Sequence, residues 1–161
     1  MFTGSRLKIE RAKKHINDLH NEIASFLKSD SHLIGIEKHP ETGYDTPKLT
    51  ITKPSPEGLA LIIGDAIHNL HSALDLAVCE VVRDKFGATA AAHVKFPFDG
   101  VSRDQFIRTQ KGRKIAEASP AIFDLILSIE PYKGGNDTLC ALHDLDILDK
   151  HELLIPMIEF R

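Results

Sequence analysis

The stretch GDAIHNLHSALDLAVCE, residues 64–80, decides the fold because its apolar residues recur at helical spacing. When residues are placed about 100° apart, one wide apolar arc takes Ile63, Ala66, Leu70, Ala73, Leu74, Ala77 and Val81. The opposite arc is polar and takes Asp65, His68, Asn69, Ser72, Asp75 and Cys79. A solvated helix face usually carries Lys, Glu or Arg, but none occurs from Leu59 to Cys79. We therefore expect the polar arc to lie at least half buried, with its Asp and His side chains hydrogen-bonded, paired or bound to a ligand.

Hydrophobic periodicity and capping signals place the other elements around this helix. Helices are predicted at 6–28, 57–86, 102–114, 120–129 and 137–150. A change to two-residue alternation predicts a β-hairpin, with Ile34 and Ile36 on one strand and Leu49 and Ile51 on the other. The apolar run at 152–160 is expected to be a strand that either joins the hairpin or continues into a longer protein. The predicted fold is mainly α: a helical bundle with one appended β-hairpin and a C-terminal strand, in a single domain spanning 1–161.

Length and composition bound the protein class. The chain has 161 residues, 42% of them hydrophobic, which suffices for the core of one domain. Its formal charge of −3 provides no overall basic field for nucleic acid or membrane surfaces. The two cysteines, Cys79 and Cys140, stand far apart in apolar stretches, which favours reduced thiols in the cytoplasm. The sequence predicts no signal peptide, no membrane-spanning segment and no membrane partner.

The predicted C-terminal helix, within LCALHDLDILDKHELL at 139–154, offers a partner for the polar arc. His143, Asp146 and Lys150 share one face of it, at positions i, i+3 and i+7. If this helix packs antiparallel to the long helix, Asp65 and His68 can face His143 and Asp146. The candidate polar cluster then comprises Asp65, His68, Asn69, His71, Ser72, Asp75, His143, Asp146, Asp149, Lys150 and His151.

This cluster has two interpretations. The D-x-x-H pair of Asp65 and His68 and the H-x-x-D pair of His143 and Asp146 are similar to the carboxylate and imidazole pairs of di-metal helix bundles. These four residues are therefore the candidate ligands of a divalent metal. The alternative is that buried polar groups merely satisfy one another, with no cofactor.

The order of motifs resembles a large family of bacterial proteins without a known activity. The matching segments are GDAIHNLHSALD, FPF, PYKGGN and LHDLDILDKHELLIP, within residues 64–156. Family members read approximately GDxxHNLRSALDHL and LxxLDxxDKHRLLIP, and they often continue beyond the LLIP segment. The resemblance implies that this chain is the front part of a longer family architecture.

The helix of that family is in turn distantly similar to HEPN domains. These are α-helical bundles, often dimeric and often RNA-cleaving, with an R-x(4–6)-H motif in which Arg stabilises phosphate charge and His transfers a proton. The family segment RSALDH has this spacing, but the two positions here hold His71 and Leu76. Leu76 can perform neither role, so we do not expect HEPN-type RNA cleavage.

A local basic segment is a candidate RNA contact. RDQFIRTQKGRK, at 103–114, contains Arg103, Arg108, Lys111, Arg113 and Lys114. These side chains are either a phosphate-binding patch or an ordinary solvated helix and turn.

Three functional hypotheses follow. The leading one is a degenerate HEPN-like module that acts by binding or assembly, as a homo-oligomer and in an RNA-linked stress or defence setting. The second is an enzyme or ligand-binding domain that uses the Asp/His cluster with a divalent metal. The third is a structural dimerisation domain, since buried polar residues can fix helix register without chemistry.

Overall fold

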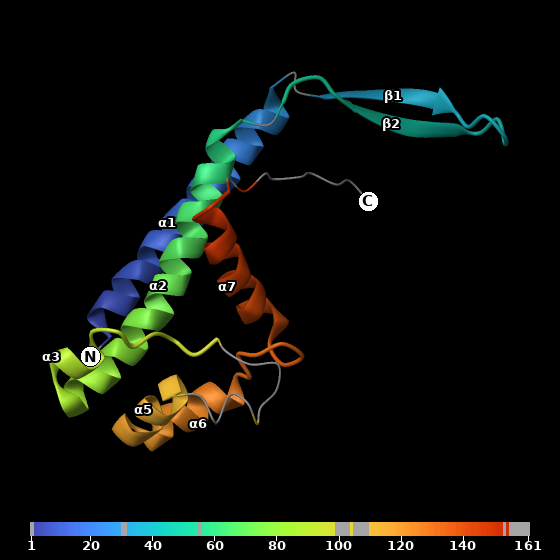
Figure 1. Ribbon diagram of the computed structural model, residues 1–161. Coiled ribbons are helices and arrows are strands. Elements are labelled where there is room, and N and C mark those ends of the chain that lie inside the picture. Colours follow the sequence, from blue (N-terminus) through green and yellow to red (C-terminus); the bar gives the residue numbers. More distant parts are fainter. Residues whose placement is uncertain are drawn as a thin grey trace.

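The computed structural model describes residues 2–29, 32–54, 56–98, 104, 110–152 and 154 (Figure 1). Its helices are α1 (Thr3–Lys28), α2 (Gly58–Phe86), α3 (Ala88–Ala91), α5 (Gln110–Ala118), α6 (Pro120–Ser128) and α7 (Asp137–Asp149). Its strands are β1 (His32–Lys38) and β2 (Asp45–Ile51). The predicted mainly α fold with an appended hairpin is confirmed.

Helix α2 is the central element of the bundle. It packs along α1 on one side and against α7 on another, and both neighbours run antiparallel to it (Figure 1). Small residues let α1 and α2 approach closely: Ala12 and Ala73 are buried, and the Ser5 hydroxyl donates to the Ala73 carbonyl oxygen at 2.7 Å. Because α2 is covered from several directions, its buried residues do not form a single arc.

The main apolar core lies at the C-terminal end of α2, where α3, α5 and α6 gather. Its buried members are Val78, Val82, Ala91, Val94, Phe96, Phe98, Ile115, Ile126 and Tyr132. The segment between α3 and residue 98 has no regular secondary structure, and its Phe96 and Phe98 side chains are buried in this core. The C-terminal part of α2 therefore packs in this core, and its N-terminal part packs against α1 and α7.

The predicted capping residues begin and end several helices. The Ser119 hydroxyl accepts the Ile122 N–H at the start of α6, and the Asn136 side chain accepts the Leu139 N–H at the start of α7. Gly87, with φ of 85°, ends α2. Local sequence chemistry thus sets the helix boundaries next to the candidate site.

The hairpin extends away from the bundle (Figure 1). Antiparallel pairing of His32 with Ile51, Ile34 with Leu49 and Ile36 with Pro47 places their side chains on the same face. Leu33, paired with Thr50, belongs to the opposite face. Most hairpin side chains are exposed, so the strands contribute little to the core.

Two expectations about the elements need correction or stay open. Of the helix predicted at 102–114, Asp104 and residues 110–114 are helical and the other residues lie outside the described ranges; α5, Gln110–Ala118, runs past Lys114, where Ile115 is fully buried in the core. The strand predicted at 152–160 lies almost entirely outside the described residues. None of the helices in the described ranges is both long and apolar enough to cross a membrane.

Candidate functional site

The interface between α2 and α7 brings together most of the predicted polar cluster. Three residue pairs follow the antiparallel register: Gly64 lies against Asp149, His68 against Asp146, and His71 against His143. The expected facing of His68 towards Asp146 is therefore confirmed. A Cβ on Gly64 would lie 2.4 Å from Oδ1 of Asp149, so the glycine permits the two helices to meet at this end.

Asp146 is the centre of this interface. Its side chain is only 1% exposed, yet three groups surround its carboxylate. His68 Nδ1 lies 2.9 Å from Oδ1, while Lys150 Nζ lies 2.5 Å and His71 Nδ1 3.5 Å from Oδ2. A buried carboxylate needs such partners because it loses its hydration on folding.

The environment of Asp146 keeps it ionised. Burial alone would raise the pKa of this carboxyl. Hydrogen bonds from Lys150 and His68, together with the nearby charges, outweigh burial and hold the pKa below its ordinary value. The interface therefore contains a stable buried anion with cationic or neutral donors around it.

His71 links this anion to a group of aromatic rings. Burial lowers its pKa, although the charges of Asp146 and Asp75 act in the opposite direction. Its Nδ1 faces both carboxylates, and its Nε2 lies 3.0 Å from Nδ1 of His143. In the neutral form that this pKa favours, a proton on Nδ1 of His71 leaves Nε2 to accept from His143.

The rings of Phe98, His143 and His71 stack against one another. Their centroids lie 4.6 Å apart for Phe98 and His143, and 4.9 Å apart for Phe98 and His71. Asp75 also holds this segment, because its Oδ1 accepts the Phe96 N–H at 2.7 Å. The polar cluster and the apolar core therefore meet at residues 96–98.

Other members of the predicted cluster lie outside this network or at its edge. Asp65 is exposed on the side of α2 that borders α1, and the His68 side chain is 51% exposed, so the expectation that both would be buried is corrected. Asn69 is buried, but it too faces α1. The Ser72 hydroxyl lies 3.4 Å from Nε2 of His68, and His151 is exposed beyond the end of α7.

The four candidate metal ligands are not brought together. His68 uses Nδ1 to contact Asp146, His143 is bonded to His71, and Asp65 borders a different groove. Among the described residues, no group of three or more His, Cys, Asp or Glu side chains is arranged to hold a metal ion. The geometry of the cluster therefore favours the interpretation in which the polar groups form hydrogen bonds and ion pairs with one another.

The predicted basic segment is only partly described. Arg103 and Arg108 lie outside the described residues, as does the side chain of Lys111. Arg113 is exposed, whereas Lys114 donates from Nζ to the Ala90 carbonyl oxygen. Lys114 thus helps to join α5 to α3, and the phosphate-binding role of this segment stays a prediction.

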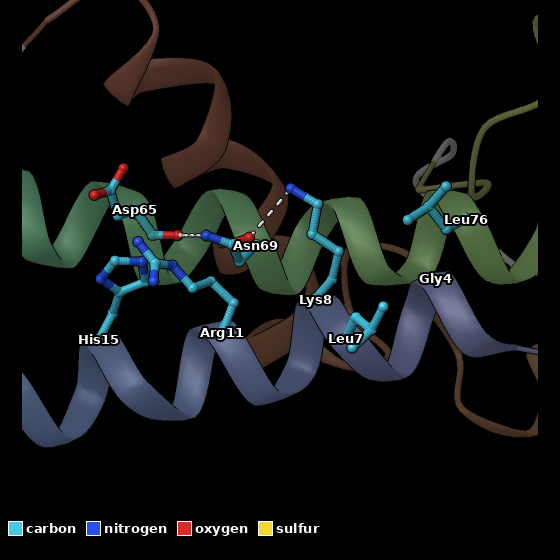
Figure 2. Close-up of a pocket in the computed structure, with 8 residues that line it drawn as sticks. All are labelled: Gly4, Leu7, Lys8, Arg11, His15, Asp65, Asn69 and Leu76. Carbon is cyan, nitrogen blue, oxygen red and sulfur yellow. Dashed lines mark hydrogen bonds between the residues drawn. The ribbon is translucent and has the colours of Figure 1, made fainter.

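A second polar region, between α1 and α2, was missed by the sequence analysis. Here Lys8, Arg11 and His15 line a groove opposite Asp65 and Asn69 (Figure 2). The available signal was RLKIERAKKH at 6–15, where five Lys or Arg residues accompany a single Glu. Apolar residues do not mark the buried face of α1, since Leu7 is 67% exposed while Ser5 and His15 are buried.

Comparisons with known proteins leave the site to be interpreted from its own geometry. No protein-family model, curated protein or solved structure matches the chain. The similarity to the bacterial family and to HEPN domains thus rests on the motifs quoted above.

Proposed function

We propose that this chain is a noncatalytic, HEPN-like helical module that acts by assembly, with a second copy of itself as the partner. The RNA-linked stress or defence setting is the one that the family resemblance implies. Both cysteines are free, which fits a cytoplasmic location. The proposal covers the domain formed by the helices and the hairpin.

The two positions that correspond to the HEPN motif support a noncatalytic role. His71 is 8% exposed, and its ring nitrogens face Asp146, Asp75 and His143. Leu76 lies on the side of α2 that faces α1 and has no group that transfers protons or binds phosphate. Neither side chain is placed to act on an RNA backbone.

The observation that carries the assembly proposal is the apolar face of the hairpin. Ile34 is 74% exposed and Ile36 is 78% exposed, and both share their face with Ile51. An isolated two-stranded hairpin is at best marginally stable in water, and exposed apolar strands favour association. A partner that covers this face would stabilise the hairpin and remove apolar surface from water.

A second copy is the partner that best fits this face. The face is self-complementary, since branched apolar side chains from both strands would meet the same set across a two-fold axis. It also carries few charges, which favours a dry contact with a like surface over an ionic contact with nucleic acid. We therefore place the hairpin at the centre of a homodimer interface.

The test is the mass in solution of the wild-type chain and of a double variant, Ile34→Thr with Ile36→Thr. Threonine keeps the strand propensity but removes most of the apolar surface. Light scattering at high micromolar concentration is expected to give a dimer for the wild type. The dissociation constant of the dimer is expected to be at least about tenfold higher for the double variant than for the wild type. This corresponds to a loss of about 1.4 kcal/mol in the free energy of association.

Leu33→Thr is the matched control. Leu33 is 62% exposed on the opposite face of the same strand, so its replacement should leave the mass unchanged. A monomeric wild type at high micromolar concentration would refute the proposal. If Leu33→Thr weakened the dimer as much as the double variant does, the stability of the strands, and not the apolar face, would govern the association.

A further inference from the structure

The groove between α1 and α2 has the size of a small-molecule site. Its volume is about 520 Å³, within the range of typical ligand pockets. Its walls come from the two helices that pack most extensively in the bundle, so they form a rigid support. The lining residues are Gly4, Leu7, Lys8, Arg11, His15, Asp65, Asn69 and Leu76 (Figure 2).

Helical spacing explains why several basic side chains line the same groove. Gly4, Lys8, Arg11 and His15 follow steps of three and four residues, so they share one face of α1. This face borders α2, where apolar residues would ordinarily cover the contact. Instead, two long cationic side chains are placed along the junction of the helices.

One of these cations is held in place before any ligand binds. Lys8 Nζ donates to Asn69 Oδ1 at 3.1 Å, and Asn69 Nδ2 donates to the Asp65 carbonyl oxygen at 2.7 Å (Figure 2). Asn69 is itself only 8% exposed. The ammonium group is thus positioned by a buried amide, which lowers the entropy lost when an anion binds.

No ion pair among the described residues neutralises the positive charge of the groove. Within the described residues, neither Lys8 nor Arg11 forms a salt bridge, whereas Lys13 pairs with Glu10 at 2.8 Å. Asp65 borders the groove and opposes an anion, but Lys8 and Arg11 together exceed its charge. Glu80, near the Gly4 end, accepts the backbone N–H of Phe2.

The two ends of the groove differ in chemistry. Gly4, Leu7 and Leu76 form an apolar end, and Lys8, Arg11 and His15 follow along α1 towards Asp65 (Figure 2). An anion alone would use only the cationic part. A ligand with a flat apolar group joined to phosphate would use both parts, and a nucleotide unit has this form.

We propose that the α1–α2 groove binds a nucleotide unit, with its phosphate on Lys8 and Arg11 and its base against Leu7 and Leu76. The unit can come from a free nucleotide or from an RNA strand. This inference goes beyond assembly through the hairpin, and the groove shares no residue with that face.

The experiment is calorimetric titration of the purified full chain at low salt, without added metal. The probes are ATP, AMP, inorganic phosphate and a single-stranded ten-nucleotide RNA. We expect at least one nucleotide-containing probe to bind, and at least about tenfold more tightly than inorganic phosphate. Binding of the RNA alone would identify the strand as the source, and binding of ATP or AMP the free nucleotide.

Variants test whether the binding is in the groove. Lys8→Ala and Arg11→Ala should each weaken it at least about tenfold, whereas Asp65→Asn should strengthen it several-fold because a repelling charge is removed. Lys13→Ala and Lys14→Ala are the matched controls, since both residues are exposed on the same helix outside the groove. Circular dichroism would verify that each variant is folded.

Three results would overturn the proposal. The first is that no probe binds at millimolar concentration. The second is that Lys13→Ala and Lys14→Ala weaken binding as much as Lys8→Ala and Arg11→Ala, which would indicate a diffuse basic surface. The third is that Asp65→Asn leaves the affinity unchanged or reduces it.

Discussion

The most consequential single residue is Asp146, since it places a fully buried charge between two helices. Its partners His68 and Lys150 are about half exposed. Their side chains therefore remain partly in water while their nitrogen atoms contact a carboxylate that is buried. The i, i+4 spacing of Asp146 and Lys150 makes one of these contacts local to α7. The contacts with His68 and His71 instead join α7 to α2, which makes Asp146 a determinant of tertiary structure.

At the same scale, His71 is predicted to make the stability sensitive to mild acid. Because burial lowers its pKa below 6.5, the unfolded chain binds a proton at His71 more readily than the folded chain. Its contribution to stability is complete above the unfolded pKa and is lost as the pH falls below it. Urea unfolding at about pH 7.5 and about pH 5.5 should show a smaller loss of stability in His71→Gln than in the wild type.

The control for this prediction is His151→Gln, because His151 is exposed at the end of α7. This variant should lose as much stability as the wild type over the same interval. The lowered pKa of Asp146 acts in a separate and more acidic window, since its contribution is lost only as the pH falls below 3.8 and through the folded pKa. Equal acid sensitivity in His71→Gln and the wild type would contradict the prediction.

At the scale of elements, α2 and α7 approach closely where Gly64 lies against the Asp149 side chain. An alanine normally stabilises a helix interior by about 0.5–1 kcal/mol relative to glycine. Here its Cβ would lie within 2.6 Å of three atoms of the Asp149 carboxylate. Gly64→Ala alone should therefore give no gain or a loss, because either the carboxylate or the helix must move.

A double-mutant cycle measures this contact. In an Asp149→Ala background the obstructing carboxylate is gone, so Gly64→Ala should stabilise the chain by about 0.5–1 kcal/mol in urea unfolding. Gly58→Ala is the control, since nothing lies within 4 Å of its Cβ. If Gly64→Ala were stabilising in the wild-type background too, the close approach of the helices would not require glycine at this position.

The elements themselves were largely predictable, and the site was predictable in part. Capping residues such as Ser119, Asn136 and Gly87 act locally, so sequence indicates them directly. The absence of Lys, Arg and Glu from 59–79 correctly indicated that Asn69 and Asp75 are covered, but Asp65 and His68 of the same polar arc are exposed. Asp65 was assigned to the wrong neighbour because spacing gives the face of a helix but not which of two packed helices covers each edge.

The α1 groove was harder to predict for a related reason. The apolar residues Leu7 and Ile9 do not mark the buried face of α1, because both are exposed. The buried position is taken by Ser5, whose hydroxyl bonds to the Ala73 carbonyl of α2. Only the position of α2 reveals that Lys8 and Arg11 line a groove between the two helices.

At the scale of the whole molecule, the bundle and the hairpin have different roles. The core residues lie in the helices, in the segment from residue 92 to residue 98, and at Tyr132 between α6 and α7, and the described hairpin residues contribute none of them. The polar interface of α2 with α7 and the groove of α2 with α1 also lie within the bundle. The hairpin thus adds an apolar surface to a structure that does not need it for its interior.

This division predicts the effect of removing the hairpin. If residues 32–51 are replaced by a short Gly/Ser linker, the helices should still form, because α1 and α2 stay connected and keep their shared contacts. The helical circular dichroism should persist, and the thermal midpoint of the monomer should change by only a few degrees, since surface changes usually alter stability by less than about 0.5 kcal/mol.

The shortened chain should be monomeric in light scattering, yet nucleotide binding in the α1 groove should be retained. Loss of the helical signal would show instead that the hairpin belongs to the folding unit, and a persistent dimer would place the interface on the bundle.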